Sequence, residues 1–94
     1  MISQPIYSVL VQWSGKTRWP YTIKTKWVEI VAPDIVIASE LALKTENPHL
    51  IHLSVSMIWP KTERRSVNGE SVLVHLFNDG AKRWLGDKLG WVRV

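Results

Sequence analysis

Two stretches of this sequence alternate apolar and polar residues with a period of two, and this pattern constrains the fold more than any other feature. One face of residues 50–59 carries the apolar side chains Ile51, Leu53, Val55, Met57 and Trp59. Residues 7–13 alternate in the same way, which places on one face Tyr7, Val9, Val11 and Trp13. Because successive side chains of a strand point to opposite faces, each stretch predicts a half-buried β-strand. We expect Leu53, Val55 and Met57 to lie in the core.

A further strand is predicted at residues 21–31, which are rich in β-branched and aromatic side chains. Its apolar residues change from one face to the other after Trp27. A β-bulge near residues 25–28 would restore the pattern, because one extra residue shifts the pleat. With residues 14–17 as the turn, residues 7–31 are predicted to form a β-hairpin.

The dipeptide Asn68-Gly69 is the strongest short-range hairpin signal in the chain. Both central residues of a type I′ turn need positive φ, which Asn and Gly tolerate best. The third strand is therefore predicted to continue past Pro60 and to pair with residues 70–77. Because proline has no backbone N–H, Pro60 indicates that this strand lies at a sheet edge or carries a bulge.

One main helix is predicted at residues 33–46. Pro33 suits the first position of a helix, Asp34 suits its first turn, and residues 40–44 have high helix propensity. The β-branched run within residues 35–38 leaves open a short strand at that place instead.

A second, short helix is predicted at residues 81–89, where Ala81, Leu85 and Leu89 recur every four residues. Residues 91–94 then follow as a last short strand.

Together these elements predict an α+β fold in which an antiparallel sheet of four or five strands packs one face against the main helix. The expected strands are 7–13, 21–31, 50–59, 70–77 and, in the five-stranded form, 91–94. The alternative is a small all-β barrel in which residues 35–38 form a strand.

Length and composition indicate one globular domain that spans residues 1–94, with 46% hydrophobic and 21% charged residues. The absence of cysteine excludes a disulfide scaffold and thiol chemistry. Residues 1–5 lack the basic start of a signal peptide, and no apolar stretch approaches the roughly 20 residues of a membrane span. We therefore expect a cytoplasmic protein that does not enter the membrane.

The sequence carries no enzyme motif, so we do not expect catalysis, although a small enzyme remains a third alternative. Residues 14–17, Ser-Gly-Lys-Thr, resemble the end of a phosphate-binding loop, but Leu10 stands where that motif needs its first glycine. His49 and His52 are three residues apart, which on a strand places them on opposite faces. No cofactor and no metal site are therefore predicted.

The remaining candidate for function is the combination of basic and aromatic residues. The net charge is +4, and the chain contains six tryptophans. Cations contact phosphates and tryptophan rings stack on bases, so basic loops with tryptophan are typical of nucleic-acid binding. The candidate binding residues form three clusters near predicted turns: Lys16, Arg18 and Trp19; Lys61, Arg64 and Arg65; Lys82, Arg83 and Trp84.

Two interpretations follow from these clusters. In the first, the chain binds nucleic acid through basic loops. In the alternative, it is a protein-interaction module, such as a small subunit of a larger assembly or a phage-type inhibitor, that docks on an acidic protein through its basic and tryptophan-bearing surface. Trp13, Trp27 and Trp59 fit apolar strand faces and are expected in the core. The oligomeric state stays open.

Overall fold

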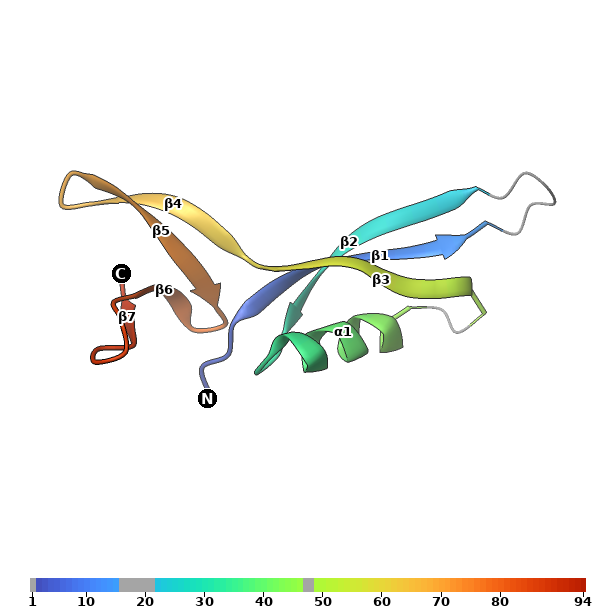
Figure 1. Cartoon of the computed structure of the whole chain (residues 1–94), viewed down its shortest axis with the longest axis horizontal. Helices are drawn as coiled ribbons and strands as arrows, with labels where there is room; N and C mark the ends of the chain where they lie inside the picture. The colour runs from blue at the N-terminus through green and yellow to red at the C-terminus, as the bar shows by residue number, and fades with distance from the viewer. Residues whose placement is uncertain (1, 16–21, 47–48) are drawn as a thin grey trace.

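The computed structural model describes residues 2–15, 22–46 and 49–94. Its strands form two antiparallel sheets, with the strand orders β2-β1-β3 and β4-β5-β6-β7 (Figure 1). The elements of the described residues are β1 (Ile6–Ser14), β2 (Ile23–Val31), α1 (Ile35–Lys44), β3 (Ile51–Pro60), β4 (Thr62–Val67), β5 (Glu70–Phe77), β6 (Gly80–Trp84) and β7 (Trp91–Arg93).

The helix α1 begins and ends close to the predicted limits. The side chain of Asp34 accepts a hydrogen bond of 2.9 Å from the backbone N–H of Ile37, which caps the first turn. Ala38 and Ala42 are fully buried, so α1 approaches the three-stranded sheet through its smallest side chains. Residues 35–38 are helical, because the cap and the packing of Ala38 outweigh the strand preference of the β-branched run.

The core lies between α1 and one face of the β2-β1-β3 sheet. Val9 and Val11 of the central strand are fully buried and form a cluster with Ala42. Half-buried apolar side chains surround this cluster: Tyr7, Trp13, Val28, Ile30, Leu53, Val55 and Ile58. The predicted core positions Leu53 and Val55 are thereby confirmed.

Met57 does not lie in the core, and a bulge explains why. Leu10 pairs with Met57 while the next residue, Val11, pairs with Val55, so Ser56 is an extra residue in β3. This insertion turns Met57 and Trp59 to the opposite face of the sheet. A second irregularity follows at His52, whose φ is 54°. The alternation in the sequence therefore overstated the regularity of this strand.

The strand β2, by contrast, pairs with β1 without a shift from Ile23 to Val31. The predicted bulge near residues 25–28 is absent. Val28 and Ile30 face the core, and Trp27 points to the other side of the sheet, since it pairs with Leu10. The change of phase in the sequence therefore does not reflect a bulge. Apolar residues occupy both faces of one regular strand, with Trp27 on one face and Val28 and Ile30 on the other.

The second sheet begins with the predicted hairpin. Val67 pairs with Glu70 across Asn68 and Gly69, whose φ values are 51° and 82°. Both values are positive, as a type I′ turn requires.

Residues 81–89 do not form the predicted helix. Lys82, Arg83 and Trp84 instead pair with residues 91–93 in a β-hairpin. Gly86 and Gly90 have φ values of 95° and 62° and close this hairpin, and neither value fits a right-handed helix. Residues 91–93 confirm the last short strand.

The single sheet expected from the sequence is divided in two at Pro60 and Lys61. The backbone N–H of Lys61 donates to Ile6 in β1, and its carbonyl accepts from Leu76 in β5, at 2.8 and 2.9 Å. One residue thus joins both sheets, and the path from β3 to β4 continues past Pro60 as predicted. Over the described residues neither sheet closes into a barrel, so the α+β class holds in its coarse form.

The molecule is long for its size, with extents of 56 × 28 × 20 Å (Figure 1). Its radius of gyration is 16.8 Å, whereas a compact domain of this length has about 12 Å. Its accessible surface is 6801 Å², whereas a folded monomer of this mass exposes about 5,500 Å². The chain therefore exposes roughly 1,300 Å² more than a compact monomer.

Candidate functional site

The most exposed apolar surface of the three-stranded sheet lies on the face opposite α1, which we name the open face. Three large side chains mark it: Trp27 on β2, and Met57 and Trp59 on β3. They expose 53%, 46% and 59% of their surfaces. Sheets of small domains normally bury each apolar face against another layer, yet among the described elements only α1 contacts all three strands of this sheet, and it packs on the other face.

The strand register builds the open face in two adjoining rows. Leu10 in β1 lies between Trp27 and Met57, and Ser8 lies between Glu29 and Trp59. Residues directly opposite each other in antiparallel strands share a face, so these side chains project together.

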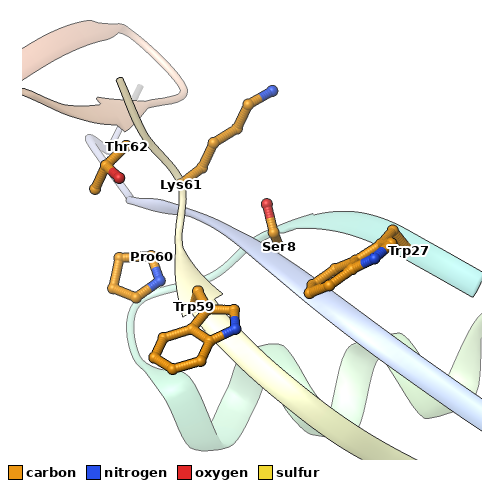
Figure 2. Close-up of a pocket in the computed structure, with 6 residues that line it drawn as sticks. All are labelled: Ser8, Trp27, Trp59, Pro60, Lys61 and Thr62. Carbon is orange, nitrogen blue, oxygen red and sulfur yellow. The ribbon is translucent and has the colours of Figure 1, made fainter. Parts of the chain in front are cut away.

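A hollow lies over Ser8, because this small side chain stands between two much larger ones. Figure 2 shows the indole rings of Trp27 and Trp59 on either side of Ser8. The hollow has a volume of about 400 Å³ and is lined by Ser8, Trp27, Trp59, Pro60, Lys61 and Thr62. It is wide open to solvent, so its shape suits a protruding side chain better than an enclosed small molecule.

The open face carries almost no net charge. Among the residues that the register places on this face, Glu29 is the one charged side chain. Lys61 forms an ion pair with it at the margin of the hollow. The face therefore presents an apolar surface with a neutralised rim, which is typical of a surface that contacts protein.

The nine residues proposed from the sequence do not come together as one site. Lys16, Arg18 and Trp19 lie outside the described residues. The strand ends that flank them, at Ser14 and Ile23, lie at the opposite end of the molecule from the β4–β5 turn (Figure 1).

The cations of the second sheet are also divided. Arg64 and Arg65 are neighbours on β4 and therefore point to opposite faces of the sheet, and Arg65 is paired with Glu63. Lys82 and Arg83 are divided in the same way on β6. Within the part of the chain that the structure describes, Arg64 and Arg83 have no ion pair.

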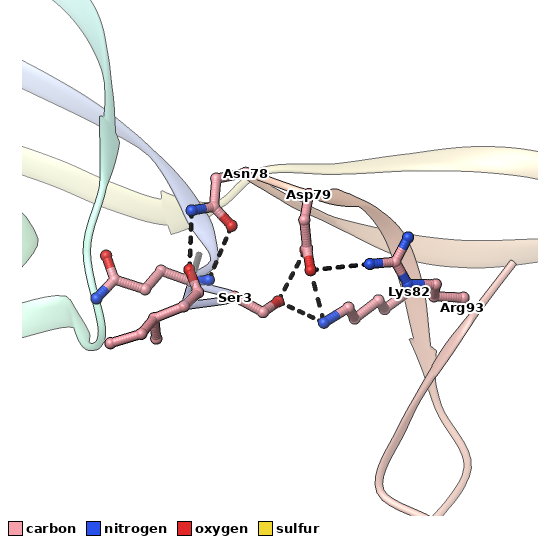
Figure 3. Close-up of polar contacts among 7 residues, drawn as sticks. Ser3, Asn78, Asp79, Lys82 and Arg93 are labelled. Atoms are coloured by element: carbon pink, nitrogen blue, oxygen red, sulfur yellow. Dashed lines mark hydrogen bonds and ion pairs between the residues drawn. The ribbon is translucent and has the colours of Figure 1, made fainter.

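Lys82 belongs to a network that holds the N-terminal segment against the second sheet (Figure 3). Its ammonium lies 3.6 Å from a carboxylate oxygen of Asp79, and it donates a hydrogen bond to the hydroxyl of Ser3. Ser3 in turn donates to Asp79 at 2.8 Å, and Arg93 pairs with Asp79 at 3.0 Å. The hydrogen bond from Ser3 lowers the pKa of the Asp79 carboxyl, and the charges of Lys82 and Arg93 lower it further.

The amide of Asn78 completes this junction. It donates to the carbonyl of Ile2 and accepts from the backbone N–H of Gln4, both at 3.0 Å. Figure 3 shows these bonds beside the Asp79 network. Because Lys82 contacts both Asp79 and Ser3 beside these bonds, its role at the junction of the two sheets is structural.

A second hollow lies where the two sheets meet. Its volume is about 410 Å³, and its lining is mostly proline and aromatic: Ser3, Pro5, Tyr7, Pro33, Pro60, His75, Phe77 and Trp91. Partial burial raises the pKa of the Tyr7 hydroxyl, and the negative charge of Asp34 adds to this rise. Trp91 packs edge-on against His75, Phe77 and Trp84, with ring centres 4.8, 5.2 and 5.3 Å apart. Trp84 exposes 51% of its surface.

Sequence reasoning missed the residues of the open face. It placed Trp27, Met57 and Trp59 in the core, and only Trp13 of the three expected core tryptophans packs there. The phase change in residues 21–31 was the available signal, because it separates Trp27 from Val28 and Ile30. For Met57 and Trp59 the sequence offers no signal, since Ser56 continues the alternation that the bulge breaks.

Comparison of this chain with protein-family models, with curated proteins and with solved structures finds no match. In residues 2–15, 22–46 and 49–94, no helix is long and apolar enough to cross a membrane. The same residues bring together no group of three or more metal-ligating side chains among His, Cys, Asp and Glu.

Proposed function

We propose that this chain is a protein-interaction module that binds its partner through the open face. The observation that carries the proposal is the exposure of Trp27, Met57 and Trp59 on a sheet whose other face is covered by α1. Contiguous apolar surface of this kind marks interaction sites in folded proteins, and tryptophan is enriched among residues that dominate binding energy.

The charge distribution supports a protein partner over a nucleic acid. A surface that follows a phosphate backbone needs several unpaired cations on one face. Of the five described cations predicted for that role, Lys61, Arg65 and Lys82 are ion-paired. The open face itself is neutral, so it fits an apolar protein surface better than an acidic one.

The proposal is tested by capture from native extract after nuclease treatment. A double variant, Trp27→Ser with Trp59→Ser, should lose the species that the wild-type chain retains. Trp84→Ser is the matched control, because Trp84 is exposed to a similar extent but lies on the other sheet. Equal capture by the double variant and the wild type would contradict the proposal.

Binding of nucleic acid stays a prediction, with its own test. Fluorescence anisotropy with random oligonucleotides at two salt concentrations should show a log–log slope of about −4 to −5 if five phosphates are engaged. Replacing Arg64 and Arg65 with alanine should then flatten the slope by roughly 2. Absence of binding at low salt would remove this alternative.

A further inference from the structure

We infer that the partner of the open face is the open face of a second copy of this chain, in a two-fold symmetrical dimer. This inference rests on the proposed function and names its partner. Two observations carry it: the amount of surface that one chain leaves exposed, and the charge of the open face.

The exposed area matches what a stable dimer needs. Each chain exposes roughly 1,300 Å² more than a compact monomer of its mass, and a standard protein interface buries about 800 Å² on each partner. The excess is therefore sufficient for one interface of ordinary size. The open face supplies part of this excess through half-exposed Trp27, Met57 and Trp59, and the second sheet supplies another part through Leu73 and Trp84.

The charge of the open face permits two identical chains to approach there. Each copy has a net charge of +4, so most pairs of surfaces on two copies repel each other. On the open face Glu29 is balanced by Lys61, which leaves no net charge to repel. Cations elsewhere are screened over a Debye length of about 8–10 Å.

The strand register fixes how two open faces would meet. A hollow lies over Ser8, and large side chains project beside it from the strands on either side of β1. A two-fold axis along β1 places β2 of each copy over β3 of the other. Trp27 of one copy then meets the strand that carries Met57 and Trp59 in the other, and this contact occurs twice by symmetry.

In the resulting dimer each apolar face of the three-stranded sheet is buried against another layer, which is not the case in the monomer. Two three-stranded sheets pack face to face, about 10 Å apart as in β-sandwiches. Each α1 stays on the outside, where it already covers the other face of its own sheet. Every apolar face of the β2-β1-β3 sheet is then covered.

The mass of the purified full chain in solution tests the inference. One chain is 10.8 kDa, so sedimentation equilibrium should show a mass that rises with concentration toward twice this value. Each single variant Trp27→Ser or Trp59→Ser removes two anchors from a symmetrical interface. The dimer dissociation constant should rise about 30-fold for each lost tryptophan, and thus about 1,000-fold for either single variant, because each variant removes one tryptophan from both copies. Trp84→Ser, as control, should leave it unchanged.

A charge pair at Ser8 tests the symmetry itself. In the proposed dimer the two Ser8 residues face each other across the axis, so Ser8→Asp and Ser8→Arg should each be monomeric alone. An equimolar mixture of the two variants should restore the dimer mass. Circular dichroism of each variant shows whether the fold is kept, and the mixture remains informative because a misfolded chain would not be rescued by its counterpart.

The outcomes separate this inference from the proposed function. A wild-type chain that stays at the monomer mass at all concentrations overturns the dimer, and the proposed function still stands if extract capture depends on Trp27 and Trp59. A dimer that Trp84→Ser disrupts and Trp59→Ser does not places the interface on the second sheet. That result overturns the dimer through the open face, and the proposed function is then decided by the capture experiment alone.

Discussion

Replacing Val9 with alanine tests the register of the three-stranded sheet. Val9 is fully buried in the central strand, between Val28 of β2 and Ile58 of β3. It also contacts the cluster that includes Ala42 of the helix. A substitution at this position therefore removes atoms that contact all three strands and α1.

The magnitude follows from the atoms removed. The two lost methyl groups represent about 1.6 kcal/mol of transfer free energy, at roughly 0.8 kcal/mol each. The site is enclosed by backbone on both sides and collapses only in part, so the cavity term raises the total to about 2–3 kcal/mol. For a domain of this length, that loss lowers the melting temperature by roughly 10–20 °C.

The matched control is Val36→Ala on α1, because it makes the same chemical change where the side chain is 60% exposed. Alanine is the better helix former, so this variant should unfold at an unchanged or slightly higher urea concentration. Both variants are compared with the wild type by urea titration at one protein concentration, since self-association would make stability depend on concentration. Equal destabilisation of the two variants would show that β1 is shifted by one residue, with Leu10 toward the helix.

Three further predictions address other elements. Gly69→Val should destabilise the fold by more than about 1 kcal/mol in a denaturant titration, because the residue has positive φ. Gly69→Asn should destabilise it clearly less. A negligible change for the valine variant would contradict a tight turn at Asn68-Gly69. Asp34→Ala should lower the free energy of unfolding by about 1 kcal/mol through loss of the helix cap. Asp34→Asn should retain most of the stability that the cap contributes, as measured in the same titration. The pKa of Asp79 is lowered in the folded state, so its contribution to stability is present above the ordinary carboxylate pKa and is lost as the pH falls through the lowered value. Asp79→Asn or Ser3→Ala should therefore flatten the acid side of a plot of stability against pH. Plots identical to that of the wild type would refute this role of Asp79.

Local signals in the sequence predicted several elements correctly. Asn68-Gly69 specified its hairpin because few other residue pairs accept two positive φ values. Asp34 and the residues after it specified α1 through a cap and helix propensity. The same kind of reasoning failed at residues 81–89, where spacing by four favoured a helix and two glycines with positive φ formed a hairpin instead.

The candidate site could not be predicted to the same extent. Basic residues that are near one another in sequence, such as Arg64 and Arg65, lie on opposite faces of their strand. Lys82 is taken up by Asp79 and by Ser3, which is 79 residues away in the chain. The contact with Ser3 does not follow from the charge of neighbouring residues, because Ser3 comes from a distant segment of the chain.

Residues a few positions apart were enough to locate most of the strands, the Asn68-Gly69 turn and helix α1, because propensity, caps and turn residues act locally. Which side of β2 and β3 faces the core depended on their pairing with β1 in the folded chain. One extra residue at Ser56 is enough to move Met57 and Trp59 from the covered face to the open face. The pleat has a period of two, so a shift of one residue reverses the face of every side chain beyond it, and pairing with β1 sets that shift.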